Sequence, residues 1–195
     1  MQIRKLVVML GAAIAVSSFG LTGCTTTPDK PNSAATNASK RTALDAEVDA
    51  TLSRTHSVVP GSRELMAKAA GVLVFPKVIQ AGLVVGGEHG NGALHIGGKT
   101  TGYYNTTSLS VGLQAGAQSK SVVFLFMTKD ALDNFRRSSG WSAGADASVA
   151  VVKVGANGSV DTTTATAPVE VIVLTNAGLM GDLSVDGTKI SKIDL

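Results

Sequence analysis

The chain has 195 residues, of which 44% are hydrophobic and 16% charged, and it contains a single cysteine, Cys24. Its 17 basic and 14 acidic residues give a formal net charge of +3. No basic run with interleaved aromatic residues accompanies that charge, which argues against nucleic-acid binding. A single cysteine also excludes an internal disulfide and a cysteine-based metal cluster.

The N-terminus has the pattern of a lipoprotein signal peptide. Arg4 and Lys5 precede an apolar run at residues 6–20, and about fifteen residues suit a signal peptide better than a membrane-spanning helix. Small residues in LTGC precede Cys24, whose thiol can accept a diacylglyceryl group. We predict a signal peptide at residues 1–23 and an acylated Cys24 as membrane anchor. The alternative is an ordinary signal peptide with a chance cysteine.

Processing at Cys24 changes the charge and the expected location of the chain. Removal of Arg4 and Lys5 leaves 15 basic against 14 acidic residues, a net charge of +1. Two or three acyl chains hold a protein stably at a membrane, since each buried CH₂ contributes about 0.8 kcal/mol. Thr25 follows Cys24, and resemblance to sorted lipoproteins then implies the periplasmic face of the outer membrane in a Gram-negative cell envelope.

The mature chain divides into a tether and one domain. Residues 24–40 are polar, contain two prolines and lack apolar periodicity, which predicts a flexible tether. Residues 41–195 are enough for one domain with one hydrophobic core.

The apolar spacing predicts two helices at the start of this domain. Leu44, Val48 and Leu52 recur every four residues, which predicts an amphipathic helix over residues 41–55. Its mixed charge favours packing on a sheet over lying in a membrane surface. A second helix follows, with Ser62 as its expected N-cap.

Residues beyond position 71 have the composition and alternation of strands. The predicted strands are residues 72–75, 83–85, 93–96, 109–113, 121–127, 147–154, 169–175, 179–185 and 189–193. One helix begins after Thr128, the expected N-cap, and ends near Gly140. Asp186-Gly187 predicts a hairpin turn before the last strand. The predicted class is α+β: N-terminal helices, then a strongly curved, mainly antiparallel, barrel-like sheet with one inserted helix.

Ten glycines lie between Gly82 and Gly116. Gly98-Lys99-Thr100 matches the end of a phosphate-binding loop, but the residues that follow, 101–105, have turn composition instead of the required helix. The glycines are therefore expected to allow bulges, bends or close backbone approach in a curved sheet.

The histidines and the single tryptophan give weak indications of chemistry. His89 and His95 would share a face of a regular strand, but a metal site needs a third ligand, and residues 90–92 between them look like a turn. We predict no enzyme, no metal and no cofactor, with hydrolysis at these histidines as a minor alternative. Trp141 is expected to be a packing residue.

Several sequence blocks resemble the SYLF domain, also called the Ysc84 actin-binding domain. In chain order they are GVLVFP at 71–76, GLVVGGEHGNGAL at 82–94, LSVGLQAGAQ at 109–118, GADASVA at 144–150 and GLMGDLSVDGTKI at 178–190. They cover most of residues 61–193. The resemblance implies a non-enzymatic lipid-binding module. Eukaryotic relatives are associated with phosphoinositide-rich membranes and yeast relatives with actin filaments, but an envelope location would separate this chain from actin.

Four lysines are the candidate contacts to anionic lipid headgroups: Lys68, Lys77, Lys99 and Lys120. Two functions stay open at this point. In the first, the domain binds lipid, through anionic headgroups or acyl chains. In the second, the lipid anchor alone attaches the chain to the membrane, and the domain binds an envelope protein partner.

Overall fold

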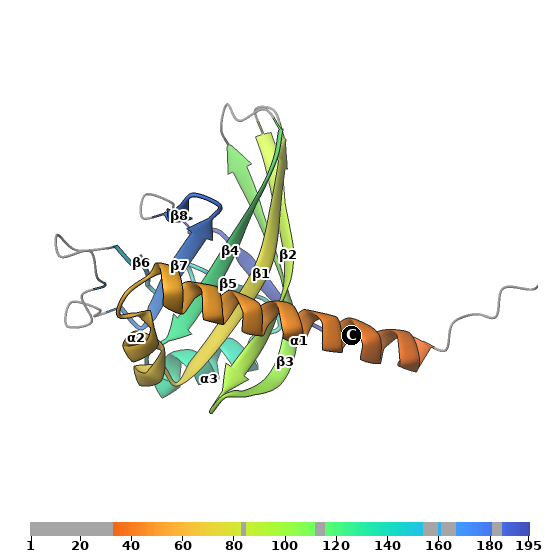
Figure 1. The fold of residues 1–195 in the computed structure, drawn as a ribbon, viewed down its shortest axis with the longest axis horizontal. Coiled ribbons are helices and arrows are strands. Elements are labelled where there is room, and N and C mark those ends of the chain that lie inside the picture. The colour runs from red at the N-terminus through yellow and green to blue at the C-terminus, as the bar shows by residue number, and fades with distance from the viewer. Residues whose placement is uncertain (1–32, 83–84, 112–115, 154–159, 161–166, 181–184) are drawn as a thin grey trace, which may run out of the picture.

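A computed structural model describes residues 33–82, 85–111, 116–153, 160, 167–180 and 185–195. The predicted signal peptide, Cys24 and the first part of the predicted tether lie outside these residues. The described part of the chain forms three helices and nine strands, and Figure 1 shows how they are arranged. The α+β prediction is confirmed.

The first helix, α1 (Ser33–Val58), is longer than predicted. Residues 33–40 are helical, so the tether prediction is wrong over that range. Their side chains are mostly exposed, and in Figure 1 this end of α1 projects beyond the sheet. Because a helix that contacts no sheet needs no apolar stripe, its alanine-rich sequence carried no periodic signal.

The other two helices differ in how they begin. In α2 (Ser62–Lys68) the N-cap is Gly61, with φ 87°, so the predicted capping role of Ser62 is wrong. The Ser62 hydroxyl is buried and donates to the Thr55 carbonyl of α1, at 3.2 Å. In α3 (Lys129–Arg137) Thr128 caps the helix as predicted, since its side chain accepts from the Ala131 N–H.

The strands form one sheet in the order β5-β9-β3-β2-β1-β4-β7-β6, with β8 paired to β7. Within the described residues all pairs of these strands are antiparallel except β6 with β7. The strands are β1 (Gly71–Gly82), β2 (Val85–Ile96), β3 (Lys99–Val111), β4 (Gly116–Phe126), β5 (Trp141–Ser142), β6 (Val149–Val151), β7 (Val169–Thr175), β8 (Gly178–Leu179) and β9 (Lys189–Ile193).

Several predicted boundaries are wrong. Residues 90–92 and 101–105, expected as turns, lie within β2 and β3. Asp186-Gly187 forms the expected turn, and β9 after it pairs with β3 and β5. The strand predicted at residues 147–154 is described as a strand only over Val149–Val151, and most of the strand predicted at residues 179–185 lies outside the described residues.

The sheet curls into a half-barrel whose inner face holds an aromatic core. Trp141 on β5 contacts Phe124 on β4 edge to face, with ring centroids 6.1 Å apart, although four strands separate β5 from β4 in the sheet. Phe135 of α3 closes this core at 5.7 Å from Trp141. Trp141 is 1% exposed, which confirms its packing role.

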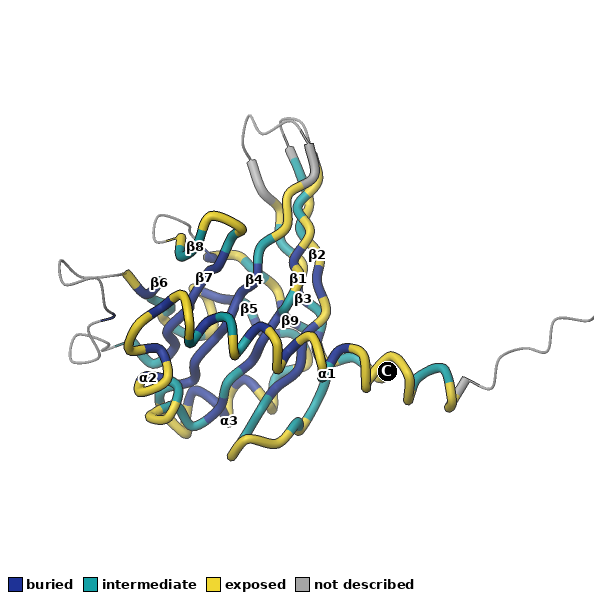
Figure 2. The backbone as a smooth tube through the Cα atoms, in the orientation of Figure 1, coloured by how far each residue is buried: buried dark blue, intermediate teal, exposed yellow. Residues whose placement is uncertain are grey.

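A second core lies between the outer face of the sheet and the helices α1 and α2. Leu44, Val48 and Leu65 are buried there against Val74 and Val123 of β1 and β4. The expected packing of α1 on the sheet is therefore confirmed. Figure 2 shows the buried residues of α1 only where the helix crosses the strands.

A β-bulge at Pro76 bends the central strand β1. Three steps along β1, from Val74 to Lys77, face two steps along β2, and the pairing with β4 shifts at the same place. Proline has no N–H for the ladder and fits inside a sheet only at such a bulge. Ser121 of β4 donates to the Pro76 carbonyl at 2.7 Å.

Two glycines of β2 let this bent strand approach closely. A Cβ added at Gly92 would lie 2.3 Å from the Val74 carbonyl oxygen, and one added at Gly90 would lie 2.7 Å from the Lys77 carbonyl oxygen. The expectation that the glycines allow close backbone approach is confirmed at these positions.

Among the described residues, one carboxyl group is buried, and it lies on β7. Glu170 on β7 is 3% exposed and accepts from the Ala167 N–H at 3.2 Å. Burial raises the pKa of Glu170, and the hydrogen bond from Ala167 opposes this shift more weakly.

The close approach at Gly92 predicts a large difference between two glycines of the same strand. Gly92→Ala should lower the free energy of unfolding by roughly 1–3 kcal/mol, because the added methyl group has no room. Gly87→Ala is the matched control, since nothing lies within 4 Å of its added Cβ, and its effect should stay within about 0.5 kcal/mol. Urea unfolding followed by Trp141 fluorescence measures both, and equal effects would contradict the bulge geometry.

Because Glu170 is buried, replacing its carboxyl group with a neutral amide should stabilise the fold to a degree that depends on pH. Because the folded-state pKa of Glu170 is raised, this carboxyl group contributes stability below its unfolded-state pKa. That contribution is lost as the pH rises through the folded-state pKa. Glu170→Gln should therefore be more stable than the wild type at about pH 7, with the difference shrinking towards about pH 4. Glu47→Gln on the exposed side of α1 is the control and should show no such trend. Urea midpoints across this range make the test.

Candidate functional site

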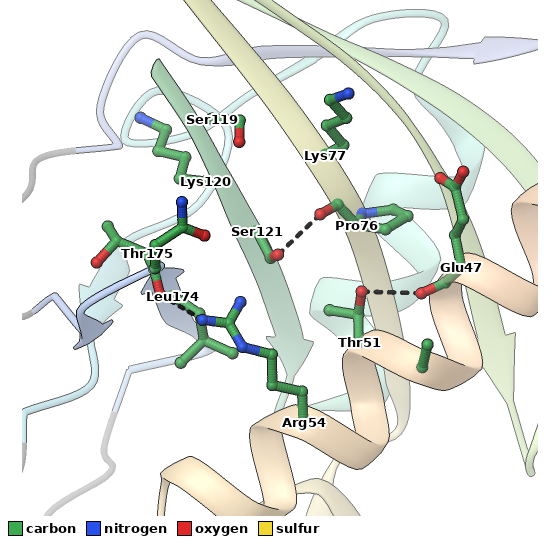
Figure 3. A pocket seen from close by; sticks show the side chains of 12 residues that line it. Glu47, Thr51, Arg54, Pro76, Lys77, Ser119, Lys120, Ser121, Leu174 and Thr175 are labelled. Carbon is green, nitrogen blue, oxygen red and sulfur yellow. Dashed lines mark hydrogen bonds between the residues drawn. The ribbon is translucent and has the colours of Figure 1, made fainter.

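A groove of about 340 Å³ separates one flank of α1 from the outer face of the sheet. We call it the α1 groove, and Figure 3 shows its lining from α1, β1, β4 and β7. Polar side chains dominate the lining and include Arg54, Lys77, Ser119 and Asn176, together with the carboxylate of Glu47. The Ser119 hydroxyl and the Asn176 amide beside Arg54 and Lys77 suit a ligand with anionic oxygen atoms.

Arg54 is held in place at one end of the groove. Its Nη2 donates to the Thr175 carbonyl of β7, and the side chain is half-buried. A guanidinium has five N–H donors, so this contact fixes its orientation while other donors can bind a ligand. Sequence reasoning missed Arg54. The helical spacing of Glu47, Thr51 and Arg54 places them on one flank, but only the sheet beside them makes that flank a groove.

Lys77 faces the groove because of the bulge. Leu73, Phe75 and Val78 belong to the inner core, so the extra residue at Pro76 places Lys77 on the outer face. It is exposed, and the described residues provide it with no ion-pair partner.

Lys120 borders the same groove, but its ammonium group is already engaged. Nζ lies 2.8 Å from Glu88 Oε1, and both side chains are 11% exposed. Ser108 donates to the other Glu88 oxygen at 3.1 Å. A nearly buried pair of this kind is costly to separate, so Lys120 is poorly suited to hold a headgroup.

The remaining two predicted lysines lie elsewhere. Lys68 pairs with Glu64 at 2.9 Å on the exposed side of α2. Lys99 begins β3 directly after Gly98 and is exposed. The structure therefore brings Lys77 and Lys120 to one groove and leaves Lys68 and Lys99 outside it.

The two histidines of β2 have different surroundings. His89 is exposed, whereas His95 Nε2 lies 3.2 Å from the Thr100 hydroxyl, which donates to Asp45 of α1 at 3.1 Å. Within the described residues no group of three or more His, Cys, Asp or Glu side chains is placed to hold a metal ion.

Past the groove the outer face carries two exposed aliphatic side chains. Ile79 is 44% exposed and Leu109 is 85% exposed. Lys77, Ile79 and Ala81 alternate along β1, and Leu109 is opposite Gly87, which is opposite Ala81. Because alternate residues and cross-strand partners share a face, Lys77, Ile79 and Leu109 lie on the same side of the sheet.

The family of this fold follows from its C-terminal part. The family model described as "Ysc84: Las17-binding protein actin regulator" matches residues 107–194. This part of the chain is a Ysc84 domain. The match to the Ysc84 domain confirms the resemblance found in the sequence and runs from β3 to β9. No curated protein matches the chain.

Two further facts limit what the Ysc84 match explains. Arg54 and Lys77 both precede residue 107, so the matched segment contains neither of these two groove cations, although it includes Lys120. Across the described residues, none of the helices is both long and apolar enough to span a membrane.

The groove geometry predicts that its two cations differ in their structural importance. Arg54→Gln should lower the free energy of unfolding by about 1–3 kcal/mol, because it removes a charged donor from the Thr175 carbonyl. Lys77→Gln, at an exposed side chain, should stay within about 0.5 kcal/mol. Urea unfolding of both variants makes the comparison, and a larger loss for Lys77→Gln would contradict the assignment.

Proposed function

We propose that this Ysc84 domain binds anionic membrane surfaces through the outer face that carries the α1 groove, while an acylated Cys24 tethers the chain to the membrane. The main observation that supports this proposal is that Arg54 and Lys77 lie on the same face as the exposed side chains of Ile79 and Leu109. Lipid binding by the domain and acylation of Cys24 are both parts of this proposal, and no enzymatic activity is included.

The charges and apolar side chains of this face match the two layers of a bilayer surface. Each Lys or Arg near an anionic leaflet contributes about 1 kcal/mol, and the Ser119 hydroxyl and Asn176 amide of the groove can hydrogen-bond a phosphate. Apolar side chains that enter the interface add about 25 cal/mol for each Å² buried. Two cations and two exposed aliphatic residues give weak binding on their own.

A tether makes weak binding sufficient. Cys24 and Ser33, where α1 begins, are nine positions apart, and a chain of that length spans at most about 30 Å. Such a short connection holds the domain at a high effective concentration at the membrane. The domain then serves to orient the protein on the surface or to recognise its lipid composition.

The Ysc84 family description names Las17 binding and actin regulation. The predicted envelope location separates this chain from both partners, so actin is not part of the proposal. An envelope protein partner on the same outer face is the alternative function, and the test below separates it from lipid binding.

The test uses the mature chain, residues 24–195, with Cys24→Ser, which keeps every described element and removes the anchor. It should co-sediment with phosphatidylglycerol vesicles at low salt and much less with phosphatidylcholine vesicles, and added salt should weaken the binding. Lys77→Gln should weaken it about fivefold, as loss of about 1 kcal/mol predicts. Lys129→Gln, exposed at the start of α3, is the matched charge control.

Two results would contradict the proposal. One is absence of sedimentation with anionic vesicles at low salt. The other is equal weakening by Lys77→Gln and Lys129→Gln, which would show a nonspecific charge effect. Loss of vesicle binding together with a reproducible crosslink from the outer face to an envelope protein would support the alternative function.

A further inference from the structure

A second pocket of about 340 Å³ lies on the other flank of α1. We call it the α2 pocket. It is formed by the end of α1, by α2, by the first residues of β1 and by the turn between β2 and β3. Leu52 and His56 line it from α1, one helical turn apart and away from the flank that carries Arg54.

Most of the wall of the α2 pocket is apolar. The apolar side chains that line it are Leu52, Met66, Ala67, Ala69, Ala70 and Val72. Ala67 is exposed and the others are half-buried, so part of each surface is open to the pocket. A volume of about 340 Å³ falls at the lower end of the range for small-molecule sites.

The ionisable groups in this lining are all basic. They are Arg63 on α2, His56 on α1 and His95 on β2, and the lining contains no carboxylate. Glu64 pairs with Lys68 outside the lining, and Asp45 reaches His95 only through the Thr100 hydroxyl. The described residues place no ion-pair partner on Arg63.

His56 reports the positive character of the pocket. Its Nδ1 lies 3.3 Å from the Ser62 hydroxyl. Burial lowers the pKa of His56, and the charge of Arg63 lowers it further. The charged and titratable groups that line the pocket with His56 are Arg63 from α2 and His95 from β2, and an anion bound there would offset the charge of Arg63.

We infer that the α2 pocket binds a single-chain amphiphile with an anionic head, its acyl chain against Leu52, Met66 and Val72 and its head against Arg63 and His56. A small inorganic anion would leave the apolar wall unused. An uncharged chain would leave the guanidinium of Arg63 without a counter-charge. Each methylene buried on the wall contributes about 0.8 kcal/mol, and the charge-assisted contacts fix the direction of the chain. This site is independent of the α1 groove.

The experiment is a titration of the mature chain, residues 24–195 with Cys24→Ser, followed by the ring signals of His56 and His95 in NMR spectra. Dodecanoate, lysophosphatidylglycerol, dodecanol and inorganic phosphate are added separately. One or both anionic amphiphiles should bind saturably and shift both ring signals, and their relative affinities identify a carboxylate or a phosphate head. Dodecanol and phosphate should bind at least tenfold more weakly.

Two variants locate the binding. Arg63→Gln should weaken dodecanoate or lysophosphatidylglycerol binding at least tenfold, whereas Arg137→Gln, exposed on α3, should leave it unchanged. Binding should also tighten as the pH falls below about 6.5, because the bound anion favours the charged form of His56. Trp141 fluorescence verifies that each variant keeps the inner core.

Clear outcomes would overturn the inference. These are equal affinity for dodecanol and the anionic amphiphiles, unchanged affinity in Arg63→Gln, or binding that leaves the ring signals of His56 and His95 unmoved. Lys77→Gln should retain amphiphile binding, so failure of the membrane proposal at the α1 groove and failure at the α2 pocket are distinguishable.

Discussion

The bulge at Pro76 is the constraint on which both cores and the α1 groove depend. Proline cannot donate to the ladder of a central strand, and the extra residue of a bulge accommodates it, with Ser121 bonded to its carbonyl. The extra residue keeps Phe75 and Val78 in the inner core and turns Lys77 to the outer face. In a regular strand, Val78 would leave the core and Lys77 would point into it.

The curl of the sheet in turn sets the position of α1. Asp45 accepts from the Tyr103 hydroxyl of β3 at 3.0 Å, and Arg54 donates to the Thr175 carbonyl of β7. These contacts hold α1 across the outer face at two distant strands, with Leu44 and Val48 buried between them. Burial and the hydrogen bond to Asp45 raise the pKa of Tyr103, which keeps its hydroxyl a donor. The α1 groove and the α2 pocket are the two flanks of this one helix.

The sequence correctly predicted those helix and strand ends that are determined by neighbouring residues. The Thr128 cap set the start of α3 and the apolar run set both ends of β7 correctly, because neighbouring residues determine these features. Glycine-rich β2 was predicted as broken because Gly90 and Gly92 resemble turn residues, whereas they relieve contact with a strand more than ten residues away. Lys120 illustrates the same limit at the site: Glu88 is 32 residues distant in the chain, so charge alone could not reveal its partner.

The two flanks of α1 also differ in the chemistry of the ligands that they suit. The α1 groove has hydroxyl and amide groups around its cations and opens beside exposed Ile79 and Leu109, which suits a headgroup that stays in a bilayer. The α2 pocket has an apolar wall behind its basic groups, which suits an amphiphile whose acyl chain has left the bilayer. Because a short tether from Cys24 would hold both sites near lipid, membrane association of the intact protein reports the anchor first. The contributions of the two flanks become measurable only when position 24 carries no acyl chain.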